Sequence, residues 1–205
     1  VLSAGFSKWA SAGGWRVGYH IYPPELKALK EAVKSAASHT YSCAPAPMQY
    51  AVAKGLSNED ECHSYILHTS RIMRTVGEFV HRELTSIGIL ATKPTAGYYV
   101  FPNFEILRTA LSKRGIETCE QMCSVLLEEG KVALMAGGPA FLRPNTEFTT
   151  RLCYVNFDGK EALEQSMKIG LSEPLPEDYV RNYAGPVYEG TMALKNWCLN
   201  QLNSA

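Results

Sequence analysis

Residues 5–19 read GFSKWASAGGWRVGY and contain a lysine and an arginine at a defined spacing. Lys8 follows Ser7 directly, and Arg16 lies eight positions further along, with glycines on both sides. A lysine amine can form an imine with an aldehyde, and a planar guanidinium can bind a phosphate through two parallel hydrogen bonds. Glycine lets the backbone turn sharply and approach an anion closely. Each of these residue types can therefore contribute to a ligand site.

The spacing S-K-x(7)-R-x-G, from Ser7 to Gly18, resembles the active-site signature of the class I and II aminotransferases. The resemblance implies pyridoxal 5'-phosphate as the cofactor, with Lys8 as the catalytic residue that forms the Schiff base. It also implies that Lys8, Arg16 and Ser7 bind the cofactor. For any one of these residues, a surface role in an ordinary turn is the alternative, but the fixed spacing of the set favours a cofactor site.

A second arginine lies far downstream, in residues 149–157, which read TTRLCYVNF and are predicted to form a strand. In the family that the chain resembles, an arginine at the start of such a strand binds the substrate α-carboxylate through a bidentate pair. The resemblance therefore implies that Arg151 is the substrate-binding residue. A surface arginine at a strand end is the alternative.

The resemblance implies an α/β protein of the pyridoxal-phosphate transferase fold type I, comprising the end of the large domain and a small α/β domain. We expect residues 1–70 to be the C-terminal part of the large, cofactor-binding domain. We expect residues 71–205 to be the small C-terminal domain, with a long connecting helix and an extra C-terminal tail. The similarity extends to about Asp158 and corresponds to the second half of a typical family member. Because the chain begins without methionine, in a predicted strand, we expect that the N-terminal half is missing and that this chain alone is inactive.

Hydrophobic periodicity and capping residues predict the order of helices and strands. Helices are predicted after Pro23-Pro24-Glu25, from about 57 to 84, over 118–129 and over 160–169, and strands over 97–101 and 132–135. Together with the Arg151 strand, these elements predict a mostly antiparallel sheet in the small domain. The tail, residues 171–205, has no role in the resembled family. Its apolar helix is expected to pack against the rest of the protein or a partner subunit, and a lid is the alternative.

Composition restricts the class of protein. Apolar residues make up 46% of the chain, charged residues make up 20%, and the formal net charge is zero, so no basic surface for nucleic acid or anionic membrane is expected. No apolar run is long enough to span a membrane. We therefore expect the protein to bind neither nucleic acid nor membranes.

The six cysteines lack the density and the spacing of a disulfide scaffold, which favours a reducing compartment. We expect a cytoplasmic protein, with a mitochondrial location as the alternative because a targeting segment would be part of the missing half. Cys119 and Cys123 share one predicted helix without further ligands, and His63 and His68 lie on different helix faces. No metal site is expected.

The predicted function is transfer of an amino group between an amino acid and a 2-oxo acid, by an enzyme that works as a homodimer in amino acid metabolism. A lyase of the same fold, similar to aminocyclopropane-carboxylate synthase, would use the same residues and is one alternative. A catalytically inactive fragment that acts as a binding or regulatory protein is another. The chain has no arginine between Arg16 and Arg71, which disfavours a substrate with two carboxylates.

Overall fold

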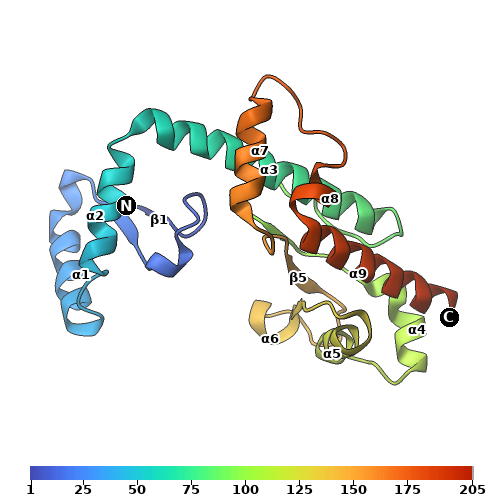
Figure 1. Ribbon diagram of the computed structural model, residues 1–205. Coiled ribbons are helices and arrows are strands. Elements are labelled where there is room, and N and C mark those ends of the chain that lie inside the picture. Colours follow the sequence, from blue (N-terminus) through green and yellow to red (C-terminus); the bar gives the residue numbers. More distant parts are fainter. Residues whose placement is uncertain (205) are drawn as a thin grey trace. The chain divides into compact units, whose positions relative to one another are not determined.

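The protein is described by a computed structural model that covers residues 1–204 (Figure 1). The chain folds into two compact units, Val1–Ser70 and Arg71–Ala205. The division falls inside the longest helix, α3 (Glu59–Thr85). Within residues 1–204, no helix combines the length and the apolar composition that crossing a membrane requires.

A two-stranded antiparallel hairpin forms the beginning of the first unit. Strand β1 (Leu2–Gly5) pairs with β2 (Gly18–Ile21), and the register places Gly5 opposite Gly18. A side chain at Gly18 would put its Cβ 3.0 Å from the Ala4 carbonyl oxygen, which is tighter than most real contacts. The close approach of the two strands therefore explains why residue 18 is a glycine. The segment between the strands contains the 3-10 turn η1 (Gly13–Trp15).

The rest of the first unit is helical. A 3-10 turn η2 (Pro24–Leu26) leads into α1 (Lys27–Thr40), and α2 (Ala46–Leu56) precedes α3. The predicted capping sequence at the start of α3 is confirmed, because the Asn58 side chain accepts a hydrogen bond from the Glu61 amide. Helix α2 begins inside residues 40–49, which read TYSCAPAPMQ and are rich in small residues and proline.

Helix α1 does not pack as its periodicity suggests. The apolar residues Leu29 and Val33 are 45% and 38% exposed, and no residue of α1 is buried. A sheet of two strands offers too little surface to cover such a helix. The sheet of this unit therefore leaves these apolar residues of α1 exposed.

A three-stranded antiparallel sheet forms the centre of the second unit, in the order β3-β5-β4. Its strands are β3 (Tyr99–Val100), β4 (Met135–Ala136) and β5 (Thr150–Cys153). The predicted antiparallel sheet is confirmed. The strand predicted over 132–135 is displaced, because only Met135 and Ala136 lie opposite β5, where they pair with Arg151 and Thr150.

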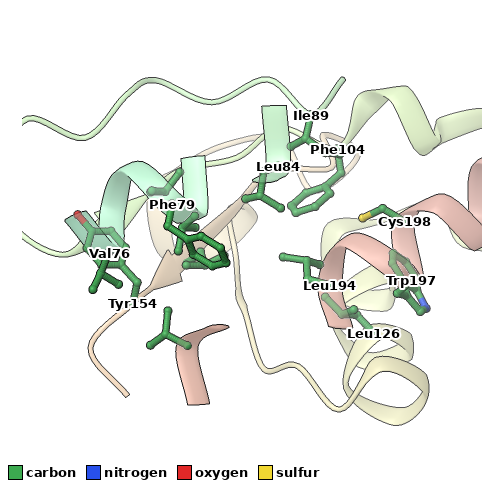
Figure 2. Packing of buried hydrophobic residues seen from close by; sticks show 14 of the residues in the cluster. Val76, Phe79, Leu84, Ile89, Phe104, Leu126, Tyr154, Leu194, Trp197 and Cys198 are labelled. Atoms are coloured by element: carbon green, nitrogen blue, oxygen red, sulfur yellow. The ribbon is translucent and has the colours of Figure 1, made fainter. Parts of the chain in front are cut away.

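Helices surround this sheet and enclose one hydrophobic core. They are η3 (Glu105–Leu107), α4 (Arg108–Lys113), α5 (Cys119–Gly130), α6 (Gly138–Phe141), α7 (Gly159–Ile169), α8 (Tyr179–Tyr183) and α9 (Gly185–Asn203). The core joins residues from α3, the sheet, the start of η3 and α9, among them Leu84 of α3, Phe104 before η3 and Leu194 of α9 (Figure 2). Thr118 caps α5 with a complete capping box, which fixes where that helix starts.

The tail is part of this core. In α9, Leu194 and Cys198 are fully buried and Trp197 is nearly so (Figure 2). The Trp197 indole donates to Glu129 of α5 at 2.8 Å, and Arg114 donates to Glu129 and to Gln201 of α9. The expectation that the tail packs against the rest of the protein is confirmed within the second unit, and α9 is an integral core helix.

Replacing Trp197 with phenylalanine should destabilise the second unit by about 1–2 kcal/mol, because the ring volume is largely kept while a partly buried hydrogen bond to Glu129 is lost. Urea unfolding followed by circular dichroism measures the change. Trp15→Phe is the matched control, since Trp15 is 41% exposed and its replacement should change stability by less than about 0.5 kcal/mol. Equal effects of the two changes would contradict the proposed importance of the Trp197 bond.

Acidification should weaken the attachment of α9. Hydrogen bonds from Arg114 and then from Trp197 lower the pKa of Glu129 below its ordinary value of 4.5. A carboxylate with a lowered pKa in the folded state stabilises the fold above its unfolded pKa, and this contribution is lost as the pH falls through the folded pKa. Glu129→Gln should therefore reduce stability most at neutral pH, and the difference from wild type should shrink below about pH 4.5. Urea unfolding at pH 7 and pH 3.5 tests this, with the neighbouring exposed Glu128→Gln as the control.

Candidate functional site

The loop between β1 and β2 holds Ser7, Lys8 and Arg16. Two backbone hydrogen bonds close it, from the Phe6 amide to the Val17 carbonyl at 3.2 Å and from the Ala12 amide to the Phe6 carbonyl at 3.1 Å. The apolar side chains of these three closing residues are buried and form a small core of their own under the loop. Its backbone is thus fixed by packing as well as by hydrogen bonds.

Lys8 lies in the turn over residues 7–10 and is exposed. Its carbonyl accepts a hydrogen bond from the amide of Ser11 at 3.2 Å. Ser11 has a left-handed backbone, with φ 51°, and its hydroxyl accepts a hydrogen bond from the Tyr65 hydroxyl of α3 at 2.9 Å. The turn that presents the lysine is therefore attached to α3. Ser7 precedes Lys8 in the same turn and is half-buried.

Arg16 follows η1 in the left-handed region, with φ 54° and ψ 41°. Its Nη1 donates to the Gly13 carbonyl at 3.0 Å. Within residues 1–204, the guanidinium makes no other hydrogen bond and no ion pair, so the remaining donors are available to a ligand. A positive φ is costly for a residue other than glycine, and such strain is commonly found at functional sites.

The residues of this loop fit pyridoxal phosphate in their chemistry. An exposed primary amine suits the aldehyde, and a guanidinium with unoccupied donors suits the phosphate. The first unit also has an open cavity of about 940 Å³, lined by Arg16 and by apolar residues such as Phe6, Trp9 and Val52. Neither Ser7 nor Lys8 lines this cavity. The cofactor fit therefore depends on the loop itself.

Arg151 belongs to the second unit, where it lies in β5. Its guanidinium carbon lies 4.8 Å from the centre of the Tyr99 ring and 5.6 Å from the centre of the Phe141 ring. Its Nε is buried and has no hydrogen-bond acceptor among the described residues. In the part of the chain that the structure describes, the side chain makes no ion pair. Arg151 is thus a cation held by aromatic rings, with donors that no protein acceptor occupies.

The four predicted site residues belong to two different units. Ser7, Lys8 and Arg16 share the β1–β2 loop of the first unit, and Arg151 lies in the second unit. Sequence reasoning missed Tyr99 and Phe141 as neighbours of Arg151. An aromatic residue in a strand is ordinarily a packing residue, and no sequence signal identified the two rings as a pair.

The cysteines do not gather into a metal site. Among residues 1–204, no group of three or more histidine, cysteine or acidic residues could hold a metal ion. Burial raises the pKa of Cys123 to about 11 and that of Cys198 to about 12, which keeps both thiols protonated at neutral pH. These two side chains act in packing.

Comparison with known proteins gives one consistent result. Residues 1–163 match the model of the family described as aminotransferase class I and II. Aspartate aminotransferase of Thermotoga maritima is 36% identical over 144 residues, which are 70% of this chain and 33% of that protein. Aspartate aminotransferase of Geobacillus stearothermophilus is 32% identical over 138 residues, which are 67% of this chain and 33% of that protein. This chain therefore spans about a third of the length of these relatives.

A solved structure is similar as well. The aromatic aminotransferase of Pyrococcus horikoshii superposes with a TM-score of 0.64 at 25% identity, covering 81% of this chain and 40% of that one. The likeness confirms the predicted fold class, an α/β fold of the type I aminotransferases.

Proposed function

This chain belongs to the class I and II aminotransferase family, and we propose that the whole protein transfers an amino group between an amino acid and a 2-oxo acid. The observation that carries the proposal is the loop from Ser7 to Gly18, in which the lysine and the arginine are presented by a fixed backbone. Members of this family generally depend on pyridoxal phosphate.

We propose that Lys8 is the residue to which the cofactor is attached. Pyridoxal phosphate, when bound, supplies an aldehyde that captures amines and a ring that draws electrons from the substrate Cα. Lys8 is exposed and its amine is carried on a flexible four-carbon stem, so the amine can reach both the cofactor and the substrate Cα, where it would move a proton. The anchoring of this turn through Ser11 and Tyr65 limits where the amine can reach.

Arg16 and Ser7 are proposed to hold the phosphate end of the cofactor. The guanidinium of Arg16 has unoccupied donors in one plane, which suits a bidentate contact with phosphate oxygens. The Ser7 hydroxyl adds a donor next to the lysine. These two contacts would orient the cofactor beside Lys8.

Arg151 is proposed to bind the substrate α-carboxylate. A half-buried guanidinium without an acid partner attracts a carboxylate more strongly than an exposed one, since less water competes for it. The relatives are named for aspartate in two cases and for aromatic amino acids in the third. The proposal accordingly concerns the α-amino and α-carboxylate groups that all these substrates share.

An assay of the whole protein with pyridoxal phosphate tests the transfer. Amino acids and 2-oxo acids are supplied as pairs, and mass spectrometry follows both products. We expect one new 2-oxo acid and one new amino acid in equal amounts. Release of ammonia or of another leaving group, without formation of the second amino acid, would contradict transfer and favour the lyase alternative.

We also propose that the whole protein is a homodimer, since aminotransferases are often dimers. Large apolar side chains are exposed in the first unit, including Leu2, Ile21 and Tyr50, which is unfavourable unless further protein covers them. Sedimentation equilibrium of the whole protein measures the state. A monomer at micromolar concentration would refute this proposal.

A further inference from the structure

Arg151 lies beside two aromatic rings that come from different elements. We propose that Tyr99 and Phe141 are positioning residues, which hold the Arg151 guanidinium with its donor edge free for a carboxylate. The inference rests on the proposed function, in which Arg151 binds the substrate α-carboxylate. It assigns to the two rings a role in affinity that neither would have as a packing residue.

The pairing of β3 with β5 brings Tyr99 next to Arg151. Tyr99 lies directly opposite Cys153. Cys153 is two positions after Arg151, so the side chains of Arg151 and Cys153 leave the same face of β5. The resulting diagonal relation across the strands lets a long side chain reach the ring. The distance of 4.8 Å between the guanidinium carbon and the ring centre is within the range of a cation–π contact.

Phe141 reaches the same guanidinium from α6. The Gly137 amide donates to the Thr149 carbonyl at 2.8 Å, which attaches the start of α6 to the segment that enters β5. A Cβ at Gly137 would lie 2.8 Å from that same carbonyl oxygen, so glycine is required for this approach. Phe141 also packs edge-on against Phe101, with ring centres 5.3 Å apart. The ring is therefore held by neighbours on more than one side.

The chemistry of a guanidinium explains what such rings would do. Its five N–H donors point outward in one plane, while aromatic rings attract its charge without accepting conventional hydrogen bonds. The buried Nε has no acceptor, and a buried donor without a partner costs free energy. A carboxylate that arrives at the donor edge would supply acceptors. Rings that restrict the guanidinium beforehand reduce the entropy that binding must remove.

Direct binding of pyruvate to the 205-residue chain, without added cofactor, tests the proposal apart from turnover. Arginine Nε–Hε signals of protein labelled with ¹⁵N-arginine are followed by NMR during a pyruvate titration, and Arg151→Lys identifies the signal of Arg151 by its disappearance. We expect the Arg151 signal to shift with saturation. A second titration, observed through the methyl signal of pyruvate, gives the affinity of each variant for pyruvate, including Arg151→Lys.

Variants separate the roles of the rings from the role of the arginine. Tyr99→Leu and Phe141→Leu should each weaken pyruvate binding about two- to fivefold, as expected for loss of one cation–π contact. Tyr99→Phe keeps the ring and should bind within about twofold of wild type. Leu142→Ala is the control beside Phe141, since Leu142 is 94% exposed. The amide spectrum of each variant verifies that it is folded.

The outcomes are distinguishable. Weaker binding in folded Tyr99→Leu and Phe141→Leu, with normal binding in the controls, supports the proposal. Unchanged affinity in both leucine variants, together with weaker binding in Arg151→Lys, would overturn the positioning role and leave the carboxylate assignment intact. Unchanged affinity in Arg151→Lys, or no pyruvate binding by wild type, would overturn the carboxylate assignment and the positioning role with it.

Discussion

A Lys8→Ala variant should lose both covalent retention of pyridoxal phosphate and measurable turnover by the whole protein. Only a primary amine can hold the aldehyde, and alanine also removes the group proposed to move the proton at the substrate Cα. The wild-type protein is incubated with pyridoxal phosphate, reduced with borohydride and mapped by peptide mass spectrometry. The label is expected on Lys8. In the variant, neither this label nor an absorbance band of bound cofactor should remain.

A matched control for Lys8 is available in α1. Lys30 is an exposed helical lysine, and Lys30→Ala should keep the labelled peptide and the turnover of wild type. The assignment of Lys8 would be refuted by a Lys8→Ala protein that still absorbs as a cofactor complex and turns over at the wild-type rate. Label distributed equally over many lysines would argue that the chain has no specific attachment point.

Removal of Arg151 is expected to have the second large effect. Arg151→Ala should raise the Michaelis constant for the amino acid, since loss of a buried partner of a carboxylate costs about 2–5 kcal/mol. This range corresponds to a factor of roughly 30 to several thousand in affinity. The Michaelis constant of Arg151→Lys should lie between those of wild type and Arg151→Ala, because an ammonium keeps the charge but not the planar, two-donor geometry. Steady-state kinetics of the whole protein with varied amino acid measures both variants.

The control for Arg151 is an arginine of the same unit with a different environment. Arg143 pairs with Glu147 at the surface, and Arg143→Ala should leave the Michaelis constant within about twofold of wild type. A normal Michaelis constant in Arg151→Ala would remove the carboxylate assignment. Cofactor retention should be unchanged in this variant, which separates the proposed role of Arg151 from that of Lys8.

The tail gives the chain a feature outside the residues that match the family. The match ends at residue 163, whereas α9 (Gly185–Asn203) contributes Leu194, Trp197 and Cys198 to the core of the second unit. Arg71 attaches the start of the tail, since its guanidinium donates to the carbonyls of Gly170 and Glu173. The tail is therefore part of the folded unit.

Several elements could be predicted because their signals are local. The starts of α3 and α5 follow from short capping sequences, in which a side chain satisfies amides only a few positions away. The apolar spacing of residues 192–202 predicts a buried helix face for the same reason. Where the signal depends on a distant partner, prediction was less accurate. Strand β4 is displaced toward Ala136, because its extent is set by what lies opposite in β5.

The sequence by itself determined the family, through the signature in which Ser7, Lys8 and Arg16 are close along the chain. The structure showed that one hairpin presents these residues in a single loop. The tertiary structure alone decided that Arg151 lies against Tyr99 and Phe141 and that its Nε has no acceptor. It also decided which apolar residues stay exposed, as in α1. The physical reason is that caps, turns and signatures depend on neighbours in sequence, whereas ring contacts, strand ends and burial depend on segments that only folding brings together.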